Sequence, residues 1–178
     1  MAKWHPEESL LQDYWTEHLP YEFSMLELTY DYLKLDHGDT INNALIESFS
    51  IHARNLIEFF RDKQDVHASH FTAAPYSPKF VGANSGALGD TRYKKLIQQV
   101  AHMTKDRTID DEKKIGGDDR DKIIGALRKE KDRFLSRIDE RFVLPDQDSV
   151  RVGSTLSTSS AFSALSLSMG ENSDPSRR

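Results

Sequence analysis

The pattern of apolar and polar positions predicts helices along most of the chain. The clearest pattern lies in residues 41–61, INNALIESFSIHARNLIEFFR, where apolar side chains recur at every third or fourth position. This spacing puts on one face of a helix the side chains of Leu45, Ile46, Phe49, Ala53, Leu56, Ile57 and Phe60. Thr40 can cap the start of this helix, and Gly38 suits the end of the helix before it.

Shorter patterns of the same kind predict four more helices. A short helix spans residues 6–15, and Pro20 separates it from a second helix over residues 21–35. This second helix is apolar on more than one side, which is typical of a central helix in a bundle. Two further helices are expected over residues 91–106 and 119–142.

Two segments lack this periodicity. Residues 62–90 hold prolines and glycines at irregular spacing, and we expect them to cover the surface of the bundle. Residues 149–178 contain ten serines and few charges, so they bury too little apolar surface to fold stably. The sequence therefore predicts an all-α fold, a four-helix-type up-down bundle with a short N-terminal helix over residues 1–143. A flexible, serine-rich tail follows over residues 144–178.

Composition narrows the class of protein. The chain has 178 residues, no cysteine and a formal charge of −5. Because cysteine is absent, disulfides, thiolate zinc sites and cysteine nucleophiles are excluded. No apolar run reaches the roughly 18 residues that a membrane span requires, and the first residues lack the apolar core of a signal peptide. We therefore expect a cytoplasmic protein without membrane contact.

Four side chains are candidates for a catalytic site. His52 and Arg54 lie on the main amphipathic helix, and His102 and Arg107 lie at the end of the next one. If these two helices pack antiparallel, the four side chains approach one another. A neutral imidazole can accept a proton and a guanidinium can hold a phosphate, which suits metal-independent cleavage of RNA by its own 2′-hydroxyl. Alternatively, both histidines are hydrogen-bonded core residues and both arginines form surface ion pairs.

Two stretches carry a resemblance to a known family. The sequences ALIESFSIHARNLIEFF and, further on, LIQQVAHMTKDR resemble bacterial helical proteins of the HEPN-like superfamily, which includes relatives of abortive-infection proteins. The resemblance covers roughly residues 40–107. It implies a defence-related homodimer that cleaves RNA through an Arg-x4–6-His motif near a helix end. In this chain His102 or His52 would be the general base, and Arg54 and Arg107 would neutralise the phosphate.

The family motif is only partly present in this chain. With four to six residues between it and His102, the motif arginine would fall at Ile97, Leu96 or Lys95, so a lysine is the only cation at those positions. Residues 61–67, RDKQDVH, do fit Arg-x5-His, but they run from a helix end into the irregular segment. A degenerate, non-catalytic relative therefore stays an alternative.

Two other features have the chemistry of ligand binding. Asp65, His67 and His70 carry zinc-binding atoms, but a structural zinc site normally has four ligands, and we expect neither a metal nor an organic cofactor. The last helix carries cations that can contact phosphate but alternate with carboxylates, namely Lys122, Arg128, Lys129, Lys131, Arg133 and Arg137. Two functions stay open: an RNA-binding or RNA-cleaving homodimer, and a non-enzymatic helical protein that binds a protein partner.

Overall fold

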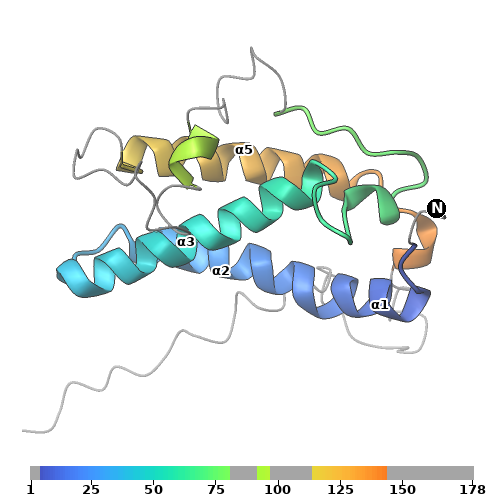
Figure 1. Cartoon of the computed structure of the whole chain (residues 1–178), viewed down its shortest axis with the longest axis horizontal. Coiled ribbons are helices and arrows are strands. Elements are labelled where there is room, and N and C mark those ends of the chain that lie inside the picture. The colour runs from blue at the N-terminus through green and yellow to red at the C-terminus, as the bar shows by residue number, and fades with distance from the viewer. Residues whose placement is uncertain (1–4, 81–91, 97–113, 144–178) are drawn as a thin grey trace, which may run out of the picture. The chain divides into compact units, whose positions relative to one another are not determined.

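The computed structural model describes residues 5–80, 92–96 and 114–143. Every regular element in these ranges is a helix, apart from an isolated bridge between Thr72 and Ile138. The predicted all-α class is therefore confirmed, and Figure 1 shows the long helices α2, α3 and α5 packed together. The complete up-down order stays a prediction, because most of the predicted third main helix lies outside the described residues.

The first helical run is continuous across a proline. It consists of α1 (Glu8–Asp13), the π-helical segment η1 (Tyr14–His18) and α2 (Leu19–Tyr32). The predicted break at Pro20 is wrong, because this proline occupies the second position of α2. In the wider π turn the Leu19 N–H donates to the Tyr14 carbonyl. The helix therefore continues through Pro20, although proline has no N–H to donate.

A short turn joins α2 to α3 (Asp39–Phe60). Gly38 caps the start of α3 with a φ of +79°, a conformation that glycine adopts without a steric penalty. The Asp36 carboxylate accepts hydrogen bonds from the Gly38 N–H and from the Asn42 side chain, both at 3.0 Å. The expected cap at Thr40 is therefore wrong, and Gly38 begins α3 instead of ending α2.

The last long helix, α5 (Gly117–Leu135), is shorter than the predicted 119–142 helix. After α5, the Asp139 N–H donates to the Phe71 carbonyl at 2.9 Å, which turns the chain towards Phe71. Asp139 then caps the 3-10 helix η4 (Glu140–Phe142) by accepting from the Arg141 N–H. α5 ends because the hydrogen bond from Asp139 to Phe71 takes the place of the next hydrogen bonds within the helix.

The core is rich in aromatic rings. Phe59 and Phe60, at the end of α3, each lie 5.6 Å from the ring of Phe134 on α5. The segment 61–80, with the short helix η2 (Ala68–His70), covers this cluster and adds the buried rings of Phe71, Tyr76 and Phe80. The expectation that the irregular segment covers the bundle is thus confirmed for these residues.

The chain divides into two units, residues 1–143 and 144–178. The predicted serine-rich tail makes up the second unit and lies outside the described residues. Within the described part, no helix combines the length and the apolar character that crossing a membrane requires.

Candidate functional site

His52 is a buried residue that links α3 to α2. Its side chain is 9% exposed, and its Nδ1 lies 2.9 Å from a carboxylate oxygen of Glu22. Asn55, one turn further along α3, donates to the same carboxylate at 3.2 Å. The ring of Tyr21 meets the imidazole edge-on at 5.6 Å. His52 therefore has the surroundings of a histidine that holds two helices together.

Arg54 lies on a different side of α3 from His52. Its Nε donates to Glu58 at 2.8 Å, and the Tyr93 hydroxyl donates to the same Glu58 oxygen at 3.0 Å. Side chains two positions apart in a helix point about 200° apart, which is why His52 meets α2 whereas Arg54 pairs with the Glu58 side chain that also binds Tyr93. The structure does not bring these two side chains into one cleft. Their predicted partners, His102 and Arg107, lie outside the described residues.

Lys95 lies six intervening residues before His102, which is one of the positions where the Arg-x4–6-His motif has its arginine. Its ammonium donates to Asp119 at 2.8 Å, and its side chain is 19% exposed. The neighbouring Leu96 is fully buried. In the described part of the chain, Lys95 thus serves to join residues 92–96 to the start of α5.

The Arg-x5-His segment also separates its two ends. The Arg61 guanidinium lies over the Tyr93 ring, 5.0 Å from its centre. The His67 Nδ1 lies 2.9 Å from an Asp62 carboxylate oxygen without hydrogen-bond geometry, and its ring stacks on His70 at 3.8 Å. Arg61 and His67 therefore contact different groups.

The candidate zinc ligands Asp65, His67 and His70 do not form a metal site. Asp65 is exposed, and the carboxylate beside His67 belongs to Asp62 instead. No cluster of three potential metal ligands occurs among the described residues.

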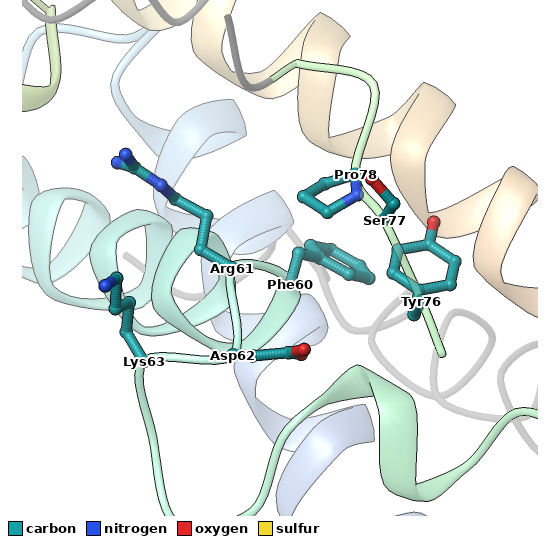
Figure 2. Close-up of a pocket in the computed structure, with 7 residues that line it drawn as sticks. All are labelled: Phe60, Arg61, Asp62, Lys63, Tyr76, Ser77 and Pro78. Carbon is teal, nitrogen blue, oxygen red and sulfur yellow. The ribbon is translucent and has the colours of Figure 1, made fainter. Parts of the chain in front are cut away.

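A pocket of about 290 Å³ opens at the end of α3 (Figure 2). Figure 2 shows Arg61 and Lys63 extending to one side, with Tyr76 and Ser77 on the other side of Phe60. The Tyr76 hydroxyl donates to Glu130 at 2.5 Å, so it is already engaged. The cations and hydroxyls of this pocket do not converge on one point, and we assign no reaction to it.

Glu130, on α5, is a buried carboxylate. It is 3% exposed and accepts hydrogen bonds from Tyr76, from the Lys79 N–H at 3.2 Å and from the Arg133 Nε at 3.1 Å. Burial and the bond to Glu130 raise the pKa of Tyr76. Spacing could have found this residue, because Glu130 lies seven positions after Ile123 on the apolar stripe.

Three of the basic side chains of α5 contact other groups of the chain. Arg128 forms an ion pair with Glu27 of α2, and Arg133 pairs with Glu130. The Lys131 ammonium lies over the Phe23 ring, 4.9 Å from its centre, and burial lowers the pKa of this lysine. These three cations bind the protein's own acidic and aromatic groups, which leaves less positive charge for phosphate than the sequence indicates.

Exposed large apolar side chains recur on α2, in the turn after it and on α3, and those on α2 lie on the side that faces away from α5. On α2, the residues that contact α5 are Phe23, Glu27 and Tyr30, which share one stripe. The exposed α2 side chains lie two positions away from this stripe, about 200° around the helix. We define the α2–α3 outer face by six large apolar side chains that are 42% to 62% exposed: Tyr21, Leu28, Tyr32, Leu35, Ile41 and Ile51.

The charged side chains in the stretch that holds the outer face are mostly acidic. Between residues 21 and 51, the exposed charged side chains are Asp31, Lys34, Asp36, Asp39 and Glu47. The single lysine of this group donates to Asp31 at 2.7 Å. The N–H of Gly38 and the amide of Asn42 lower the pKa of Asp36, so this carboxylate stays charged at neutral pH. The charged side chains exposed along this stretch are thus mostly acidic.

No family model, curated protein or solved structure matches this chain. The HEPN-like resemblance therefore stays a prediction.

Proposed function

We propose that this chain is a helical interaction protein that binds a partner protein through the α2–α3 outer face. The observation that carries the proposal is the gathering of exposed large apolar side chains. Six of the seven such side chains among the described residues lie on this face, and the seventh is Val143. Single exposed apolar residues are ordinary, whereas a contiguous apolar patch with a polar edge is typical of an interaction site.

The size of the face agrees with this function. Six large side chains that are each about half exposed present on the order of 600 Å² of surface, at the upper end for a typical monomer. A standard protein interface buries about 800 Å² on each partner. The apolar side chains of the face thus account for most of the area that a specific partner would cover.

The surroundings of the candidate catalytic residues support binding more than chemistry. His52 is buried against Glu22 and Arg54 is paired with Glu58, so each has a structural partner of its own. An enzyme that uses both side chains would need them at one solvent-reachable cleft. In the described residues they lie on different sides of α3.

Photo-crosslinking in living cells that express the protein tests this function. A photoreactive phenylalanine analogue placed at Leu28 should give a covalent adduct with a partner protein. The same analogue at Val143, which is 60% exposed but lies away from the outer face, is the matched control. Adducts of equal yield from both positions, or none from position 28, would contradict the proposal.

A second candidate function is RNA cleavage by a homodimer without a metal. It is supported by the HEPN-like resemblance and by the Glu22–His52 pair, since a carboxylate at Nδ1 orients an imidazole for proton transfer at its other nitrogen. The test is cleavage of RNA by the purified chain in chelator, compared with the His52→Ala and His102→Ala variants. Absent cleavage, or undiminished cleavage in both variants, would remove this candidate.

A further inference from the structure

We propose that the partner segment on the α2–α3 outer face is a cationic amphipathic helix of another protein. This inference rests on the proposed function and goes further by naming the chemistry of the partner. It follows from the shape of the apolar stripe, the sign of the surrounding charge, and the way α5 binds the opposite side of the same hairpin.

The apolar stripe has the length and spacing for a helix to bind along it. Tyr21, Leu28 and Tyr32 recur at intervals of seven and four residues on α2, which places them in one line about 16 Å long. Ile51 extends the surface onto α3, and Leu35 and Ile41 add to it where the two helices join. A partner helix of three to four turns covers this length and packs its own apolar stripe against it.

The charges select a cationic partner over a second copy of this chain. Asp36, Asp39 and Glu47 are exposed carboxylates, and Lys34 is already bound to Asp31. A second copy would present the same mostly acidic surface, so it would add negative charge to the interface instead of complementing it. Lysine or arginine side chains flanking an apolar stripe would instead meet opposite charge, which favours both encounter and register.

The opposite side of the hairpin already binds a helix of this kind. α5 packs an apolar stripe against α2 and α3, and its Arg128 pairs with Glu27 of α2. Its Lys131 lies over the Phe23 ring. The α2–α3 hairpin therefore binds a helix with flanking cations on its inner side, and the outer face offers similar groups to a partner.

Fluorescence anisotropy with synthetic peptides tests this inference on the full chain. The probe is a labelled amphipathic leucine–lysine peptide of about 18 residues, with leucines at helical spacing. Two matched peptides serve as controls, one with glutamate in place of lysine and one with the same composition in scrambled order. We expect saturable binding of the first peptide, with at least about tenfold weaker binding of each control.

Chain variants then locate the binding site. Leu28→Gln and Ile51→Gln should each weaken binding of the leucine–lysine peptide about tenfold, whereas Val143→Gln should leave it unchanged. Equal affinity for the glutamate peptide, or no effect of either face variant, would overturn the inference. Sedimentation of the parent chain gives the remaining outcome. A dimer that Leu28→Gln dissociates would make a second copy the occupant, which overturns the inference but leaves the outer face as a protein-binding surface.

Discussion

Replacing Arg133 with methionine tests how the segment 61–80 is held on α5. The Arg133 side chain is 16% exposed, and the Glu130 side chain that it pairs with is 4% exposed. Arg133→Met keeps an apolar stem but removes the guanidinium. Glu130 then retains only two of its described donors, the Tyr76 hydroxyl and the Lys79 N–H.

The expected loss follows from the burial of this pair. Removing one partner of a buried ion pair costs about 3–5 kcal/mol, since a charge is left uncompensated in the interior. Because Glu130 keeps two neutral donors, we expect Arg133→Met to lower the free energy of unfolding by about 2–4 kcal/mol. The matched control is Lys34→Met, which breaks a pair exposed by 57% and 59% and should lower the free energy of unfolding far less than Arg133→Met does.

Urea unfolding followed by circular dichroism measures both variants. At a denaturant slope of about 2 kcal/mol per molar, Arg133→Met should lower the urea midpoint by about 1–2 M. Adding Glu130→Gln to Arg133→Met should restore part of the loss, because a neutral amide needs no cation. A midpoint equal to that of Lys34→Met, or a double variant that is weaker than the single one, would refute the reasoning.

Three further predictions concern other described residues. Burial raises the pKa of Tyr76 above its usual value of 10.0, so the stability contributed by this tyrosine is complete below about pH 10 and is lost as the pH rises towards the folded-state pKa. Urea midpoints between pH 9 and pH 11 should accordingly fall less steeply in Tyr76→Phe than in the parent chain. Gly125→Ala should raise the free energy of unfolding by about 0.5–1 kcal/mol, since this helical position has open space for a methyl group. Gly38→Ala should lower it by about 1 kcal/mol, because Gly38 has a φ of +79°. Thermal unfolding of the two variants measures both effects. His52→Ala should cost about 1–3 kcal/mol in chemical denaturation because it removes a buried partner of Glu22, and a cost below 0.5 kcal/mol would show that the pair is not structural.

The sequence predicted helix faces well because periodicity reports directly on burial. Phe49, Leu56 and Phe60 were expected on the inner face of the main helix, and each is at most 1% exposed. Packing decides these positions, and packing acts on all residues of one stripe together. The all-α class could therefore be predicted without knowledge of any tertiary contact.

The ends and joins of helices were harder to predict because they depend on local hydrogen bonds. Pro20 was expected to break the helix, but the π turn before it lets the helix continue although proline lacks an N–H. Gly38 looked like an end cap for the preceding helix, although its positive φ serves the start of α3. One residue type can fill either role, and composition alone does not distinguish them.

The partners of the polar residues could not be predicted, because those partners are distant in sequence. Glu22 lies 30 residues before His52, and Tyr76 lies 54 residues before Glu130. Sequence spacing identified His52 as facing inwards, but only the fold supplies the carboxylate that it meets. The outer face was missed for a related reason, since an apolar side chain on α2 reads as core until its neighbours are known.

Side-chain footprinting by hydroxyl radicals tests the central claim most directly. In the purified chain Tyr21, Leu28 and Tyr32 should be oxidised readily, as expected for side chains that are about half exposed. Addition of the leucine–lysine peptide should protect these three side chains and leave Val143 as reactive as before. If the three are already unreactive in the chain alone, or if protection appears on α5 instead, the α2–α3 outer face is not the binding surface.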